Sequence, residues 1–422
     1  MITDIFAGPG GWDTGARLAG YAGPLVGVEW DDAACRTAIA AGHPRIRADV
    51  STFDPTVFTG LVDGLIASPP CQAWSMAGDR KGELDRDAVY ARIAAFAAGR
   101  EPDAEYEWAD ERSHLTAEPM RWAVALKPRW IACEQVPAVL PLWQYMAELL
   151  RGQGYRAWAG ILSAEEYGVP QTRKRAILIA RRDGIPVGPP VPTHQSYRAG
   201  QQVNTDAGLF GALLPAPVSM ADALGWAEDT VVVSNYGTGG DARDRGERLA
   251  SVPSSTVTSK IDRAKVVAQA RNSSPGAYTI RANASGSQRS GTEWRMAPAG
   301  RTSKMVEPRP ITDPAHTLTT KATAAWVWRN GLQENATSRG MAEPAGTVYC
   351  SRPGNLSLAS DSDSRQVTVQ EAAVLQSFPA DYPWQGTKSA QYRQVGDAVP
   401  PLLAAAILRP LLRDAVEMRD AA

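Results

Sequence analysis

Short apolar runs alternate with segments of helical periodicity throughout residues 1–180 of this chain. Such alternation is typical of α/β domains, in which helices cover both faces of a parallel or mostly parallel sheet. It therefore predicts one such domain at the start of the chain. The expected strands are Ile2–Ala7, Pro24–Glu29, Gly64–Ser68, Arg129–Glu134, Ala157–Leu162 and Ala176–Ala180.

The pattern changes at Ile185–Pro192, with the sequence IPVGPPVP. Proline fixes φ and lacks an N–H donor, so this string continues neither a helix nor a strand, and it indicates a domain boundary. Beyond it, short strand-like pieces are bounded by Pro, Gly, Asn and Ser. Helical spacing returns only at Val369–Phe378 and Pro401–Leu412. The middle of the chain is therefore predicted to be a separate, loop-rich and mostly β unit.

Charge is distributed unevenly along the chain, although the net charge is only -1. Residues 231–330 hold 15 Lys and Arg against 7 Asp and Glu, which suits a surface that meets a polyanion. An ordinary solvated face is an equally good explanation. In the same region a motif recurs at Pro253–Lys260, Pro314–Lys321 and Pro344–Val348, with unequal spacings that favour repeated hairpins over a solenoid.

Composition excludes several classes of protein. With 44% hydrophobic and 21% charged residues and no apolar run of membrane-spanning length, the chain is expected to be soluble and globular. Asp4 lies too near the start for a secretory signal, and the four cysteines are too widely spaced for a disulfide framework or a zinc site. We therefore expect no membrane partner, no metal and a cytoplasmic location.

A glycine-rich turn follows the first expected strand, in the string Asp4–Trp12, DIFAGPGGW. Such a turn brings backbone N–H groups close to a ligand, although by itself it is equally consistent with a purely structural turn. The second expected strand ends in Glu29-Trp30, a carboxylate for ribose hydroxyls and a ring for an adenine. Asp13 stands where a dinucleotide fingerprint needs its third glycine. The pattern therefore favours a nucleoside cofactor without a pyrophosphate.

A candidate nucleophile lies in the string Leu65–Ser75, LIASPPCQAWS. Its two prolines force the chain out of the strand and hold Cys71 at the carboxyl end, where α/β enzymes carry reactive groups. The alternative is a buried cysteine that packs as a small hydrophobic residue. That alternative fits Cys35 and Cys133 better, because they lie within apolar helix and strand patterns.

Charged residues follow the next strands. Ile131–Pro137, IACEQVP, puts Glu134 at a strand end, and buried carboxylates are uncommon without a task. In Tyr167–Arg175, YGVPQTRKR, alternation aims Arg173 and Arg175 at one face, which suits an anion but is also common on solvated edges.

In this order, these elements resemble the DNA (cytosine-5) methyltransferase family of the bacterial or phage type. The match continues in Arg365–Pro379, with the pattern RxxTxxExxxLQxFP, and in Gln394–Pro401, QVGDAVPP. Only the middle unit has no counterpart, at the place where this family keeps its variable target-recognition domain. The resemblance implies a Rossmann-like catalytic domain that uses S-adenosyl-L-methionine, and a smaller, mostly β or irregular target-recognition domain.

The resemblance also implies domain limits. Residues 1–183 would form the catalytic and cofactor-binding domain, and residues 184–364 the target-recognition domain. Residues 365–388 would be a hinge segment, and residues 389–422 a C-terminal helix that returns to the catalytic domain.

The resemblance assigns the chemistry to the residues around Cys71. Its thiolate would add to C6 of a flipped cytosine, so that C5 attacks the sulfonium methyl group, while Glu134 holds N3 and the exocyclic amine. Arg173 and Arg175 are left as candidates for the thiolate, a base or a phosphate, and the base that removes the C5 proton is not identified. The catalytic set is Pro70, Cys71, Gln72, Glu134, Arg173 and Arg175.

The same resemblance implies a donor site and a DNA-binding surface. We expect the chain to act on double-stranded DNA as a monomer. The cofactor set is Phe6, Gly8, Gly10, Gly11, Glu29, Trp30, Asp49, Pro69, Asp397 and Val399. The candidates for DNA contact are Ser75, Lys260, Arg281, Arg289 and Lys321.

The segment after Cys71, with Gly78 and Gly82 as hinges, resembles the family's mobile loop. Residues 83–111 carry nine acids against three bases and are interpreted as an insertion in that loop that faces solvent.

Three positions depart from the family pattern. Gln135 and Ser163 stand where asparagine is usual, and Asp397 follows Gly396 where the family usually has Gly-Asn. An added carboxylate near the donor is expected to favour the cationic sulfonium.

Three alternatives remain open at this point. A dinucleotide-dependent oxidoreductase conflicts with the missing third glycine and with the Pro-Cys-Gln string. An RNA (tRNA) cytosine-5 methyltransferase shares the catalytic motifs, but the long basic insert favours sequence reading on duplex DNA. A catalytically inactive DNA-binding relative conflicts with the intact Cys71, Glu134 and both arginines.

Overall fold

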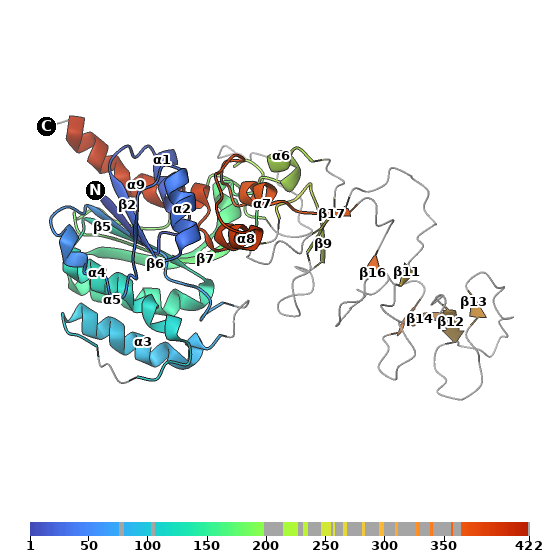
Figure 1. The fold of residues 1–422 in the computed structure, drawn as a ribbon, viewed down its shortest axis with the longest axis horizontal. Helices are drawn as coiled ribbons and strands as arrows, with labels where there is room; N and C mark the ends of the chain where they lie inside the picture. The colour runs from blue at the N-terminus through green and yellow to red at the C-terminus, as the bar shows by residue number, and fades with distance from the viewer. Residues whose placement is uncertain are drawn as a thin grey trace, which may run out of the picture. The chain divides into compact units, whose positions relative to one another are not determined.

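Figure 1 shows the fold in a computed structural model. The structure describes residues 1–75, 80–102, 106–197, 214–226, 246–254, 256–257 and 364–420, together with short strands between residues 231 and 357. By contacts between residues, the chain divides into two units. The first is Met1–Gln269 with Arg365–Ala422, and the second is Ala270–Ser364.

The first unit is built on a seven-stranded sheet with the order β3-β2-β1-β4-β5-β7-β6. Strands β3, β2, β1, β4 and β5 are parallel, whereas β7 is antiparallel to both β5 and β6. The expected α/β fold with a mostly parallel sheet is thus confirmed. The strands are β1 (Ile2–Ile5), β2 (Leu25–Glu29), β3 (Arg45–Arg47), β4 (Gly64–Ala67), β5 (Trp130–Gln135), β6 (Arg156–Ser163) and β7 (Lys174–Arg181).

Helices cover both faces of this sheet (Figure 1). On one face Ile5 and Leu65 pack with Ile93 and Trp143, which come from the helices α3 and α5. On the other face Ile2 packs with residues of α1 and α9. The helices of the first unit are α1 (Gly11–Leu18), α2 (Asp32–Ala40), α3 (Gly82–Ala97), α4 (Glu118–Leu126), α5 (Leu140–Gly152), α6 (Met220–Leu224), α7 (Val369–Leu375), α8 (Lys388–Asp397) and α9 (Pro401–Asp420).

All six expected strands are present, with bounds shifted by one or two residues. The edge strand β3 was not expected, because two of its three residues are arginines and it carries no apolar run. The expected helices at 369–378 and 401–412 are confirmed as α7 and α9. Helix α8 was not expected either, since its sequence KSAQYRQVGD is mostly polar.

The expectation that the whole acidic stretch at 83–111 faces solvent was wrong. Most of it forms α3, which buries Val89, Ile93 and Phe96 in the core beneath the sheet. Asp85 is also fully buried, and it accepts hydrogen bonds from the N–H groups of Ala109 and Asp110. The acidic residues make the stretch negatively charged, but its apolar residues recur at helical spacing, and this apolar face packs α3 against the core.

A third core joins the later part of the first unit. Met220 of α6 and Val257 pack with Ala372 of α7 and with Tyr392 and Val395 of α8. Lys388–Leu412 is the one stretch among the described residues with the length and apolar composition of a membrane span, and 78% of its apolar window is buried inside the protein. Its composition is therefore explained by its packing.

Residues 231–366 contribute short strands, mainly in antiparallel pairs. Those that pair in the second unit are β11 (Arg281–Ala282) with β16 (Leu356–Ser357), and β12 (Arg295–Pro298) with β13 (Arg309–Pro310) and β14 (Trp326–Arg329), which also pairs with β15 (Ser338–Gly340). The remaining strands, in the order β17-β10-β8-β9, are β17 (Ser364–Gln366), β10 (Lys265–Val267), β8 (Val231–Ser234) and β9 (Gly246–Leu249).

Candidate active site

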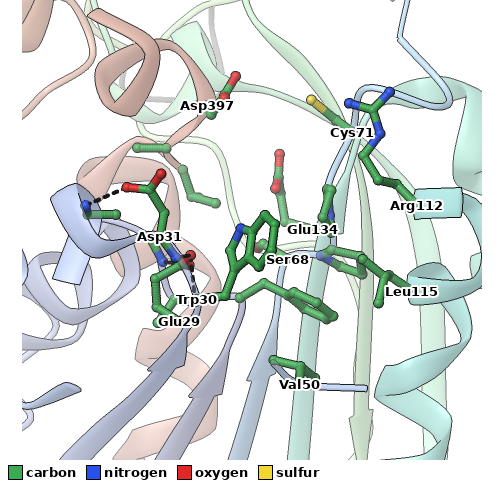
Figure 2. Close-up of a pocket in the computed structure, with 18 of the residues that line it drawn as sticks. Glu29, Trp30, Asp31, Val50, Ser68, Cys71, Arg112, Leu115, Glu134 and Asp397 are labelled. Atoms are coloured by element: carbon green, nitrogen blue, oxygen red, sulfur yellow. Dashed lines mark hydrogen bonds between the residues drawn. The ribbon is translucent and has the colours of Figure 1, made fainter. Parts of the chain in front are cut away.

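A pocket of about 610 Å³ opens at the carboxyl ends of β1 and β4. The strand order reverses between these two parallel strands, and this is where open α/β sheets bind their ligands. Figure 2 shows Glu29 and Trp30 at one end of the pocket, Cys71 and Asp397 at the other, and Glu134 between them. The residues that line the pocket all belong to the first unit.

The glycine turn after β1 adopts conformations that require its glycines. Gly10 has φ of +110°, and a Cβ there would lie 2.7 Å from both His43 and Tyr382. A Cβ on Gly11 would collide with the carbonyl oxygen of Val399. The turn therefore lets the segment between α8 and α9 approach β1 closely, which completes this wall of the pocket.

A buried ion pair between Arg45 and Asp13 contacts the backbone of the glycine turn. The Arg45 guanidinium binds both carboxylate oxygens of Asp13, at 3.0 and 2.7 Å, and its Nε lies 3.3 Å from the Gly8 carbonyl oxygen. Asp4 of β1 is completely buried, and burial, together with the Asp13 charge, raises its pKa. Asp13 thus has a structural role as the partner of Arg45, besides being the residue that departs from the dinucleotide fingerprint.

Glu29 is held in place by three backbone N–H groups. Those of Trp30 and Asp31 donate to Oε1 at 2.9 and 2.7 Å, and that of Gly8 donates to Oε2 at 2.8 Å. Burial raises the pKa of Glu29, and these three hydrogen bonds oppose that rise. A carboxylate offers about four acceptor positions, so capacity remains for a ligand hydroxyl. The indole of Trp30 is 73% exposed and extends over the pocket (Figure 2).

Cys71 lies directly after the two prolines that end β4. Its carbonyl oxygen accepts the N–H groups of Trp74 and Ser75, so the chain turns back at once and leaves the thiol on the pocket wall. Burial and the Asp397 carboxylate raise the pKa of the Cys71 thiol to about 11, while Arg175 acts in the opposite direction. At neutral pH the thiol of the free protein is therefore protonated.

Glu134 and Arg175 form an ion pair on the pocket wall. Nε of Arg175 lies 2.7 Å from Oε1 of Glu134, and both side chains are largely buried. Within the described ranges no hydrogen bond reaches Oε2 of Glu134, so this oxygen is available to a ligand in the pocket.

Arg173 also lines the pocket, but backbone carbonyl groups engage its guanidinium. One terminal nitrogen donates to the oxygens of Val257 and Gly396, at 2.9 and 3.1 Å, and the other donates to Ala398 at 3.1 Å. The side chain is buried, and burial lowers its pKa. Arg173 thereby joins the segment at 256–257 to the end of α8, which makes it a positioning residue in this structure.

Gln135 accounts for one departure from the family pattern. Its side-chain amide donates to the carbonyl oxygen of Pro69 at 2.8 Å and accepts the N–H of Val136. The longer glutamine side chain therefore ties β5 to the loop that carries Cys71.

Most of the residues expected from the sequence meet in this pocket. Gly10 lies behind the wall, against His43 and Tyr382, and Ser75 lies outside the lining. Lys260, Arg289 and Lys321 fall outside the described residues, as does Gly78, and the side chain of Arg281 is not described. The expected residues that line the pocket are Phe6, Gly8, Gly11, Glu29, Trp30, Asp49, Pro69, Pro70, Cys71, Gln72, Glu134, Arg173, Arg175, Asp397 and Val399.

Sequence reasoning missed several lining residues. Several of them come from two places: the 3₁₀ helix η2 (Glu111–Ala117), and helix α8 with its partner Asp31, which Arg393 contacts at 3.3 Å. Among the sequence motifs, only the end of the expected mobile loop and the Gln394–Pro401 string lie near these residues. The missed residues include Asp31, Arg112, His114, Leu115, Arg393 and Gln394.

No group of His, Cys, Asp and Glu with the arrangement of a metal site is found among the described residues. Cys35, Cys71 and Cys133 are free thiols, and Cys35 and Cys133 are buried as expected. The pocket therefore offers a thiol, carboxylates and guanidinium groups as its chemistry, next to an open aromatic face.

Comparison with known proteins gives a consistent match. The sequence model of the family described as C-5 cytosine-specific DNA methylase matches residues 1–105 and 98–413. Type II methyltransferase M.AgeI of Thalassovita gelatinovora is 27% identical, over 96% of this chain and 97% of its own length. Type II methyltransferase M.DdeI of Desulfomicrobium norvegicum is 26% identical, over 96% and 87%. The solved structure of the Entamoeba histolytica methyltransferase EhMeth superposes with a TM-score of 0.48 at 12% identity, over 98% of both chains.

Proposed function

Because this chain belongs to the C-5 cytosine-specific DNA methylase family, we propose that it methylates C5 of a cytosine within a specific sequence of double-stranded DNA. S-adenosyl-L-methionine is the methyl donor, and Cys71 forms a transient covalent bond with the base. The chain acts as a monomer in the cytoplasm of a bacterial or phage-infected cell.

The residues at one end of the pocket fit the donor. Glu29 retains acceptor capacity for ribose hydroxyls, and the exposed face of Trp30 offers a stacking surface for an adenine. At Gly8 there is open space where a Cβ would stand, so the backbone can approach a ligand closely. When bound, S-adenosyl-L-methionine supplies an electrophilic methyl group on a cationic sulfur.

The other end of the pocket fits the base. A stacked cytosine cannot reach Cys71, so the nucleotide must leave the duplex before it reacts. Addition of the Cys71 thiolate to C6 makes C5 nucleophilic. Oε2 of Glu134 is available to accept a hydrogen bond from the exocyclic amine, on the ring edge that carries N3, as charge builds on the ring. Arg175 fixes the orientation of Glu134 through Oε1.

The raised pKa of Cys71, about 11, fits a nucleophile that is silent without substrate. The thiol stays protonated in the free protein, which limits side reactions. Bound substrate must therefore help to ionise it, with the charges of Arg175 and Arg173 favouring the thiolate.

The observation that carries this proposal is the meeting of Cys71, Glu134 and Arg175 in one pocket with Glu29 and Trp30. Conversion sequencing of DNA from cells that express the chain tests it. We expect protected cytosines in one recurring sequence, and no protected cytosines with Cys71→Ser. Cys35→Ala, which removes a buried thiol outside the pocket, should keep the protection.

Two results would contradict the proposal. Cytosines that stay protected from conversion in Cys71→Ser would contradict the assignment of Cys71 as the nucleophile. A lack of protected cytosines with the wild-type chain would contradict the proposed function. Duplex DNA and a transcript of the same sequence, offered side by side with labelled donor, separate DNA from the RNA alternative.

A further inference from the structure

We propose that Asp397 is the base that removes the proton from C5 of the methylated cytosine. This inference rests on the proposed function and adds a catalytic residue to it. Asp397 ends helix α8 and lies on the pocket wall, where Figure 2 shows it at the same end of the pocket as Cys71.

Asp397 lies close to the nucleophile loop. Its Oδ2 atom is 3.5 Å from Nε2 of Gln72, the residue that follows Cys71. After burial, the Asp397 carboxylate is the strongest influence on the Cys71 thiol and raises its pKa, ahead of Arg175 and Glu134. The carboxylate and the sulfur therefore face the same part of the pocket, although their positions in the sequence are far apart.

Four of the five other carboxylates that line the pocket have partners of their own. Glu134 pairs with Arg175, and Glu29 is bound by three N–H groups. Asp49 accepts the N–H and the hydroxyl of Ser51 at 2.9 and 2.7 Å. Asp31 caps α2 and pairs with Arg393.

The one histidine in the lining does not serve this step. After burial, the charges that act on the pKa of His114 are those of Arg92, Glu111 and Asp49. Its ring packs against Trp108, with the centroids 5.8 Å apart, and the Cys71 thiol is not among the groups that act on it.

The chemistry requires a base on the side of the sulfur. When C5 accepts the methyl group it becomes tetrahedral, and its hydrogen turns to the face opposite the incoming group, where the bond from C6 to Cys71 lies. Asp397 takes this hydrogen as a proton. The electron pair of the broken C5–H bond reforms the C5–C6 double bond, and the C6–S bond breaks to release Cys71 as a thiolate.

The surroundings of Asp397 suit an acceptor of protons. Asp397 lines the pocket and is partly exposed to solvent, so it can pass the proton on to water. The protein packed around the carboxyl group raises its pKa, which Arg173, Arg393 and Arg175 oppose. The groups that face it are thus Arg173 and Arg175 at the start of β7, Arg393 of its own helix, and Cys71 with Gln72 after β4.

Substrates that differ only at C5 test the proposal with Asp397→Asn. In 5-fluorocytosine the fluorine cannot leave as a cation, so the covalent adduct persists and no base is needed to form it. We expect Asp397→Asn to form this adduct with donor present at least as fast as the wild type, because losing the Asp397 charge also lowers the pKa of Cys71. On cytosine its turnover should fall by about 100-fold or more, and a denaturation-resistant adduct should accumulate.

The pH dependence gives a second readout. Turnover of the wild-type enzyme should rise with pH as Asp397 ionises. This rising part of the pH profile should be absent in Asp397→Asn. Asp32→Asn is the matched control, because Asp32 pairs with Arg47 on the exposed face of α2 and does not line the pocket. Its turnover and pH profile should match those of the wild type.

Three outcomes would overturn the inference. If Asp397→Asn turned over cytosine at the wild-type rate, Asp397 would not be the base. The same would follow if its turnover still rose with pH as in the wild type. Equal slowing on both substrates, with weaker donor binding by calorimetry, would show that Asp397 only attracts the cationic sulfur. If the wild-type enzyme forms no fluorocytosine adduct, the proposed function itself fails, which is a distinct result.

Discussion

Oε1 of Glu134 and Nε of Arg175 are 2.7 Å apart, and the two side chains are only 8% and 12% exposed. The pair connects the antiparallel strand β7 to the end of β5, at a place where each charge would be costly alone. It keeps a carboxylate next to the nucleophile loop without leaving a buried charge uncompensated.

Arg175→Met should therefore destabilise the protein by about 3–5 kcal/mol, because it leaves the Glu134 carboxylate buried without its partner. The double variant Glu134→Gln/Arg175→Met should recover much of this loss, since neither charge remains. Denaturant unfolding of the wild type and the variants measures both effects. The pair would have no structural importance if Arg175→Met unfolded at the wild-type midpoint.

The placement of α3 in the core leads to a second prediction. Ile93 is completely buried, whereas Leu84 on the same helix is 74% exposed. Ile93→Ala should cost about 2–5 kcal/mol because it opens a cavity in the core, while Leu84→Ala should change stability little. Thermal unfolding of the two variants compares them. Equal and small effects would instead favour the interpretation that this stretch faces solvent.

Sequence reasoning succeeded where the signal was local. The apolar runs identified the strands, and the residues at their carboxyl ends, such as Cys71 and Glu134, could be placed in one site because parallel strands end at the same edge. The interpretation of α3 failed because charge was counted and periodicity was not. Val89, Ile93 and Phe96 already marked a buried helical face.

Relationships between distant segments could not be predicted in this way. Nothing local in Arg173 indicates that its guanidinium binds carbonyl groups at Val257, Gly396 and Ala398. The approach of Asp397 to Gln72 likewise depends on how α8 packs against the end of β4. Such contacts are decided by tertiary packing, and the sequence pattern of either segment carries no trace of them.

The close approach of Gly11 to Val399 gives a third prediction. A Cβ at Gly11 would collide with the Val399 carbonyl oxygen, so Gly11→Ala must push the segment between α8 and α9 away from the pocket. We expect weaker donor binding by calorimetry and a lower melting temperature. Gly152→Ala is the control, because its Cβ would meet no atom within 4 Å at the end of α5. The two variants should behave differently, and unchanged donor affinity in Gly11→Ala would argue against this wall as part of the donor site.

The raised pKa of Cys71 predicts slow alkylation of the free protein. With a pKa of about 11, the thiolate fraction grows tenfold for each pH unit up to that value. At pH 8 it is roughly 200-fold smaller than in a free cysteine with pKa about 8.5. Iodoacetamide should therefore label Cys71 slowly at pH 8 and steadily faster as the pH rises, as measured by mass spectrometry of the peptide that contains it.

Asp397→Asn removes the neighbouring carboxylate that helps to raise the pKa of Cys71, so it should speed labelling at pH 8. Labelling at the rate of a free thiol in the wild-type protein, or no change in Asp397→Asn, would mean that the thiol is not governed by burial and by Asp397.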